Sequence, residues 1–119
     1  MKRHERFLTT TMPSAFHWFN EPVKFHLGQG LELFTDDKTD FWQRTHYGFQ
    51  VDNGHCYFIN LSGDWSIKTH VTYLYRALYD QCGLMVRADA QNWIKLSVEK
   101  EQSTNNRLGS VVTNLGYSD

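Results

Sequence analysis

Residues Tyr79 to Glu99 read YDQCGLMVRADAQNWIKLSVE and carry the strongest β pattern of the chain. Apolar residues alternate with other types along two arms: Leu84, Val86 and Ala88 on the first, and Ile94, Leu96 and Val98 on the second. Strict alternation is typical of a half-buried strand. Two such arms in succession predict an antiparallel hairpin.

The two apolar rows also predict the register of this hairpin. Opposed residues of an antiparallel pair share a face, so the rows meet only across a connection of odd length. Asp89-Ala90-Gln91 supplies such a connection, with three residues. The expected apolar pairs are Val86–Ile94, Leu84–Leu96 and Cys82–Val98, and the other face pairs Arg87–Trp93, Met85–Lys95, Gly83–Ser97 and Gln81–Glu99. We expect the apolar face to be buried and the second, chemically richer face to be exposed.

Composition narrows the class of protein. With 119 residues, of which 40% are hydrophobic, the chain suits one domain with a modest core. The net charge is -1, so the chain lacks the excess of basic residues that attracts nucleic acid or an anionic membrane surface, and we expect it to bind neither. No apolar segment follows the charged start, which predicts no signal peptide and a cytoplasmic protein. Cys56 and Cys82 fall in apolar rows, where buried thiols are expected rather than a disulfide.

The rest of the chain predicts short antiparallel strands. Residues 1–15 read as a loose N-terminal arm, and residues 16–119 as one all-β domain, an antiparallel β-sandwich. An aromatic run at residues 16–22 ends at a turn signal. Further runs predict strand structure at residues 31–35, 41–42 and 110–114, with a polar loop at 102–107. Residues 72–82 fit either one or two helical turns or a strand end followed by a loop. We favour the strand end and loop, because the flanking β patterns leave little room for a helix.

Two further β elements are expected between these strands. Asn53-Gly54 is a typical type I′ turn, which would pair Val51 with Cys56 and Phe49 with Phe58. The run from Trp65 to Tyr73 also alternates, and predicts a strand with Trp65, Ile67, Val71 and Tyr73 directed inward.

Catalytic and metal signals are weak. Glu99 and Glu101 lie two apart on a strand, roughly 6.5–7 Å at the backbone, a spacing compatible with glycoside hydrolysis. A solvated strand end is the alternative, because Glu99-Lys100-Glu101 lacks the further acidic residue of such enzymes. The six histidines show no metal-ligand spacing. We expect no cofactor and no metal, and an enzyme is the less favoured class.

A set of ordered motifs resembles a known family. The motifs are Trp18-x-Asn20-Glu21-Pro22, Thr39-Asp40-Phe41-Trp42, Tyr79-Asp80-Gln81-Cys82-Gly83-Leu84, Trp93-Ile94-Lys95, Glu99, Ser110-Val111-Val112-Thr113 and Tyr117-Ser118-Asp119. They resemble the domain-of-unknown-function family DUF1349, which is related to fungal regulation-of-enolase proteins. The resemblance implies a concanavalin A-like lectin/glucanase jelly roll with one concave face, and no established activity.

The leading functional hypothesis is a non-enzymatic carbohydrate-like ligand site on that concave face. Sugar sites need an aromatic platform with polar groups at its rim. The candidate residues are Tyr79, Asp80, Gln81, Arg87, Trp93, Lys95 and Glu99. The structural alternative is a stacked Arg87–Trp93 pair and a Lys95–Glu99 salt pair. A regulatory protein–protein interaction module is the second hypothesis, and a glycoside hydrolase the third.

The resemblance also predicts a partner. Family members usually continue beyond the Ser-Asp pair with a tryptophan and further strands, whereas this sequence stops at Asp119. A jelly roll without those strands has open edges and an uncovered apolar side, which favours association. We therefore expect a homo-oligomer, or a second polypeptide that completes the sheets.

Overall fold

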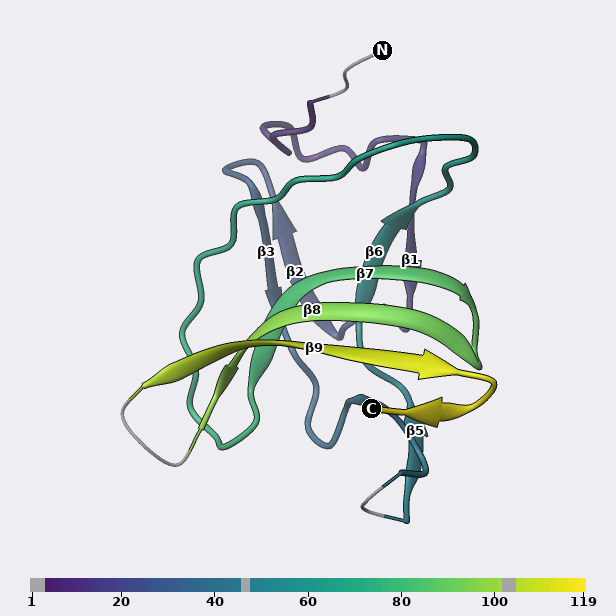
Figure 1. The fold of residues 1–119 in the computed structure, drawn as a ribbon. Coiled ribbons are helices and arrows are strands. Elements are labelled where there is room, and N and C mark those ends of the chain that lie inside the picture. The colour runs from purple at the N-terminus through teal and green to yellow at the C-terminus, as the bar shows by residue number, and fades with distance from the viewer. Residues whose placement is uncertain (1–3, 46–47, 102–104) are drawn as a thin grey trace. The chain divides into compact units, whose positions relative to one another are not determined.

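The computed structural model describes residues 4–45, 48–101 and 105–119, and within them the chain is all-β (Figure 1). Ten strands are present: β1 Phe16–Phe19, β2 Lys24–Leu27, β3 Leu31–Phe34, β4 Phe41–Gln43, β5 Gln50–Asp52, β6 Cys56–Ile59, β7 Gln81–Asp89, β8 Asn92–Lys100, β9 Asn106–Asn114 and β10 Tyr117–Ser118. The pairings β1–β6, β2–β3 and those of the sheet β10-β9-β8-β7 are antiparallel. The predicted all-β, antiparallel fold class is confirmed, while the jelly-roll arrangement stays a prediction.

The chain divides into two compact units. The first takes in the sequence as far as Phe41 together with Val51–Trp65, and the second comprises Trp42–Gln50 and Ser66–Asp119. Aromatic side chains form the centre of the first unit. Phe16 stacks on Tyr57 with ring centroids 5.1 Å apart, and Trp18 lies 4.6 Å from Tyr57 and 4.9 Å from Phe25. Bulky aromatic contacts of this kind stabilise short strands that have few ladder bonds of their own.

Part of the expected N-terminal arm packs on the rest of the first unit, to which it belongs. The Phe7 ring lies 5.5 Å from Phe16 and 5.8 Å from Tyr57. The carbonyl oxygen of Phe7 accepts hydrogen bonds from the amides of Gly28 and Gly30, which belong to the β2–β3 turn. Both glycines have positive φ angles, of 137° and 95°.

The predicted hairpin at Asn53-Gly54 is wrong. β6 pairs with β1, so that Cys56 lies opposite Phe19, and β5 pairs with β4. Neither turn residue has the positive φ that a type I′ turn requires. The amides of Asn53 and Gly54 both donate to the carbonyl of Asp40. A Cβ at Gly54 would lie 2.2 Å from the Phe41 ring, so close packing rather than turn geometry explains the glycine.

The predicted strand from Trp65 to Tyr73 is also wrong. This segment joins no sheet of the described residues and is drawn as an irregular trace between β6 and β7 (Figure 1). Trp65, Ile67 and Tyr73 are exposed rather than inward. An alternating segment forms a strand only where a neighbouring strand accepts its backbone hydrogen bonds. Of the strand end and loop favoured for residues 72–82, the loop is confirmed, since the described residues there contain no helix, whereas the strand end is wrong.

Two boundaries near the C-terminus also differ from expectation. β9 begins at Asn106, so the expected last strand at 110–114 is the second half of a longer one. The expected polar loop at 102–107 therefore loses its last two residues to β9. Residues 102–104 of that loop lie outside the described residues.

Candidate functional site

The β7–β8 hairpin has the predicted register. Val86 pairs with Ile94, Leu84 with Leu96, and Cys82 with Val98, while Arg87 pairs with Trp93 on the other face. The turn is shorter than expected, because Asp89 pairs with Asn92 and a β-bulge between Arg87 and Asp89 takes up one residue. The Asp89 carboxylate closes this turn by accepting hydrogen bonds from the Gln91 amide and the Asn92 side chain. Both bonds hold the pKa of Asp89 below its ordinary value, and the bond from the Gln91 amide has the larger effect.

β9 extends both faces of the hairpin by one strand. Ile94 lies opposite Val112, Leu96 opposite Ser110, and Val98 opposite Leu108. One side of these strands therefore carries nine uncharged residues in three rows, with three residues on each strand. We name these nine residues the apolar face: Cys82, Leu84, Val86, Ile94, Leu96, Val98, Leu108, Ser110 and Val112. The opposite side of the same strands, here named the Trp93 face, carries Arg87, Trp93 and Thr113 in one row.

The exposure of the two faces is the reverse of the prediction. Trp93 is 2% exposed and Lys95 8%, and Ser97 and Thr113 are buried with them. On the apolar face, Ile94 is 43% exposed and Leu96 49%. Alternation determines which residues share a face, whereas burial depends on what packs against each face. The expected burial of the apolar face is therefore wrong, although the pairing that defines it is right.

The structure places most of the predicted ligand residues together. Gln81, Arg87, Trp93, Lys95 and Glu99 share the Trp93 face, and the ammonium of Lys95 lies 6.0 Å from the centre of a Trp93 ring. Tyr79 and Asp80 precede β7. Arg87, Gln81 and Glu99 are half-buried, and Tyr79 is 56% exposed. The indole of Trp93 therefore does not present a solvent-exposed stacking surface.

Several of the predicted polar groups make bonds within the fold. The carboxylate of Asp80 accepts hydrogen bonds from the amides of Arg76 and Ala77, at 2.8 and 2.9 Å. The side chain of Gln81 donates to the Tyr79 carbonyl and accepts from the Ser97 hydroxyl. These contacts order the entry into β7.

Sequence reasoning missed a buried polar cluster in the second unit. The backbone amide of Gln43 donates a hydrogen bond to the Ser118 hydroxyl at 2.8 Å. That hydroxyl shares a 2.7 Å hydrogen bond with the Thr113 hydroxyl. Gln43 and Ser118 are each 1% exposed. Nothing in the residue pattern brings β4 and β10 together, so the sequence carried no signal for this cluster.

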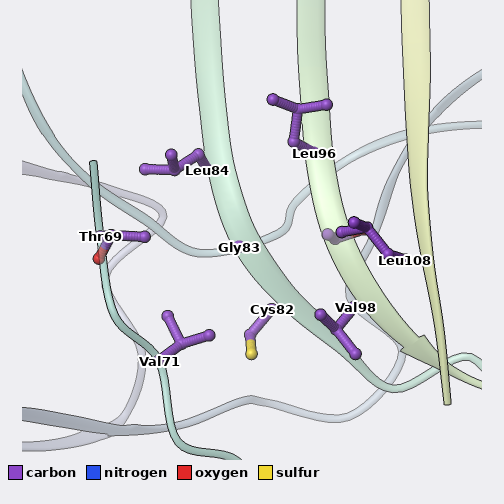
Figure 2. A pocket seen from close by; sticks show the side chains of 9 residues that line it. Thr69, Val71, Cys82, Gly83, Leu84, Leu96, Val98 and Leu108 are labelled. Atoms are coloured by element: carbon purple, nitrogen blue, oxygen red, sulfur yellow. The ribbon is translucent and has the colours of Figure 1, made fainter. Parts of the chain in front are cut away.

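A hollow lies at one end of the apolar face. Its volume is about 190 Å³, and it is lined almost entirely by apolar surface. Figure 2 shows Thr69 and Val71 on one side and the side chains of the sheet on the other. Leu108 also lines the hollow, and it was missed because it falls between the expected loop and the expected last strand.

Tyr75 fastens the segment before β7 near this hollow. Its hydroxyl donates to the Val98 carbonyl at 2.5 Å and also lies 3.1 Å from the Cys82 sulfur. Burial and the hydrogen bond to Cys82 raise the pKa of Tyr75 above its ordinary value of 10.0. Cys82 and Cys56 are both thiols and are half-buried rather than fully buried.

The described residues provide no metal centre and no helix that could cross a membrane. No group of three or more His, Cys, Asp or Glu side chains there could hold a metal ion. No described helix has the length and apolarity that a membrane crossing requires. Glu101, the second carboxylate of the hydrolase hypothesis, forms an ion pair with Arg107 at 3.2 Å.

Comparison with known proteins extends this picture. A family model described as "Protein of unknown function (DUF1349)" matches residues 18–119. The chain belongs to the DUF1349 family. It is 40% identical over 103 residues to "Regulation of enolase protein 1" of Saccharomyces cerevisiae, a match that covers 86% of this chain and 51% of that protein. The DUF1349 chain thus spans about half the length of that curated relative.

A solved structure supports the same relationship. It is titled "The crystal structure of a functionally unknown protein from Saccharomyces cerevisiae", and the DUF1349 chain matches it with a TM-score of 0.68 and 36% identity. The match covers 89% of this chain and 57% of the yeast chain. The predicted family is confirmed by both comparisons.

Proposed function

We propose that this chain is a non-enzymatic regulatory module that acts through contacts with protein, and that the apolar face is its contact surface. One observation carries the proposal: Val86, Ile94 and Leu96 of the apolar face are exposed, while the aromatic Trp93 of the opposite face is buried. An exposed, contiguous apolar patch on a folded unit is typical of a protein interaction site. A sugar site would instead present an open aromatic ring with polar neighbours.

The regulated process is taken from the yeast relative, whose name is "Regulation of enolase protein 1". The proposal can be tested in a Saccharomyces cerevisiae strain that lacks this relative. We expect the chain to restore the enolase activity of cell extracts to the level of the parent strain. This readout detects regulation whether the module contacts enolase itself or another protein.

Matched variants connect the activity to the apolar face. Leu96→Lys places a charge at the centre of the face, and Leu115→Lys makes the same change at a position outside it that is 72% exposed. We expect Leu115→Lys to restore enolase activity and Leu96→Lys to fail. Equal restoration by both variants would show that the apolar face is not the contact surface.

A carbohydrate-like ligand site is the second candidate function, and the exposed ring of Tyr79 beside Gln81 favours it. A glycan array followed by a tryptophan fluorescence titration tests this candidate. Binding that is lost in Tyr79→Ala and retained in Leu96→Lys would support the sugar site. An array on which no glycan binds the wild-type chain would eliminate it.

A further inference from the structure

Much of the apolar face is open to solvent. The exposed side chains there are Val86 at 41%, Ile94 at 43%, Leu96 at 49%, Leu108 at 76% and Val112 at 46%. Among the described residues, the buried apolar side chains are Pro22, Phe41 and Trp93.

We infer that the apolar face binds a second copy of this chain, forming a two-fold symmetric dimer. This inference rests on the proposed function, because it names the partner of the same surface. Sheets that stack face to face lie about 10 Å apart with their side chains interdigitated. Such stacking covers the three rows of the apolar face on both copies at once.

The first argument for a second copy is electrostatic. None of the nine residues of the apolar face is charged, so no like charges meet within these three rows when two copies face each other; Lys100 lies in the next row of the same side, opposite Asn106 at the end of the sheet. The net charge of the whole chain is -1, which adds little repulsion at longer range. A strongly charged partner would find no complementary group among these nine residues.

The second argument is shape. The apolar face carries both a protruding side chain, Leu108, which is 76% exposed, and the hollow of about 190 Å³ beside it. A cavity of about 150 Å³ accommodates a benzene molecule, so this hollow has room for a leucine side chain. In a two-fold interface a residue of one copy contacts its counterpart site on the other, and the reverse. Leu108 of each copy can therefore enter the hollow of its mate.

Figure 2 shows what forms the hollow that would receive this side chain. Val71 and Thr69 face Leu84 and Cys82 across it, so its wall depends on the segment before β7. The Tyr75 hydroxyl, bonded to the Val98 carbonyl, fastens that segment close by. The receiving site is therefore present in the single copy and does not have to be built on association.

Sedimentation equilibrium between about 1 and 100 μM tests the inference. We expect the apparent mass to rise from that of the monomer toward twice that value. Leu96→Lys and Leu108→Lys should each weaken dimerisation by at least about tenfold, because each would bury an unpaired charge in an apolar interface. Leu115→Lys should dimerise like the wild type. Far-UV circular dichroism of each variant verifies that the sheet is still formed.

The possible outcomes separate this inference from the proposed function. A monomer at every concentration, or a dimer that both face variants leave intact, overturns the inference. A monomeric chain whose Leu96→Lys variant still fails in yeast would mean that a different protein occupies the face. A face-dependent dimer without effect on enolase activity would uphold the dimer and refute the regulatory function.

Discussion

Replacing Ser118 with alanine should loosen the second unit from inside. The hydroxyl of Ser118 accepts the Gln43 amide at 2.8 Å and shares a 2.7 Å hydrogen bond with Thr113. All three residues are buried, so no water can take over these bonds readily. A buried amide left without an acceptor costs about 1–3 kcal/mol, and a lost neutral hydrogen bond about 0.5–1.5 kcal/mol. We expect Ser118→Ala to lower the stability of this region by about 2–4 kcal/mol.

Amide hydrogen exchange is the appropriate assay, because it reports on one backbone group at a time. A cost of about 1.4 kcal/mol corresponds to a tenfold change in an equilibrium constant, so exchange at Gln43 should quicken by at least about tenfold. Ser110→Ala serves as the control, since Ser110 is exposed on β9. Unchanged protection at Gln43 in Ser118→Ala would refute the argument. Equal loss of protection in the control variant would show that the effect is not specific to the buried bonds.

Three other substitutions test further features of the second unit. Gly83→Ala should cost at least about 2 kcal/mol in urea unfolding, because the new Cβ would lie 1.9 Å from the Leu96 carbonyl oxygen. Gly109→Ala, whose Cβ meets nothing within 4 Å, is its control, and equal costs would contradict the clash. Burial, and after it the contact with Cys82, raises the pKa of Tyr75 in the folded chain. The neutral phenol therefore stabilises the fold fully below the ordinary pKa of 10.0, and this stabilisation is lost as the pH rises through the raised pKa of the folded chain. Unfolding measured from pH 7 to 11 should show less alkaline destabilisation in Tyr75→Phe than in the wild type, and identical profiles would contradict this. The hydrogen bond from the Gln91 amide, and after it the bond from the Asn92 side chain, lowers the pKa of Asp89 in the folded chain. The ionised carboxylate therefore stabilises the fold above the pKa of the unfolded chain, and this stabilisation is lost as the pH falls through the lower pKa of the folded chain. An NMR titration should show the Gln91 amide resonance shifting with that protonation, and Asp89→Ala should abolish the shift.

The register of the central hairpin could be predicted because it depends on parity alone. Two apolar rows meet only when the connection between them has an odd number of residues, whatever else surrounds the sheet. The bulge beside Asp89 left this conclusion intact, since it moved one residue from the turn into the strand. A local rule therefore succeeded where its outcome did not depend on distant contacts.

The turn at Asn53-Gly54 failed for the opposite reason. Its two residues favour a tight hairpin locally, but in the fold the Asn53 side chain donates to the Lys38 carbonyl and its carbonyl oxygen accepts the Asp40 amide. Gly54 is needed where the Phe41 ring approaches its backbone. Contacts with a segment about thirteen residues earlier in the chain outweigh the turn preference, and no local pattern records them.

The face assignment and the Trp65–Tyr73 segment failed through one shared cause, and this cause bears on association. An alternating sequence specifies a row of apolar side chains and a row of backbone bonding groups, but not the molecule that supplies the facing layer or the neighbouring strand. We expected the rest of the chain to cover the apolar face and to pair with the Trp65–Tyr73 segment. In the described residues, Leu96 of that face is half-exposed and the segment joins no sheet. Apolar rows without a cover and an alternating segment without a ladder are what a surface shows when its complement lies on another molecule. Apart from Trp65, both features lie in the second unit, which also carries the proposed dimer interface. A dimer would supply the missing layer over the apolar residues of β7, β8 and β9 from outside the chain.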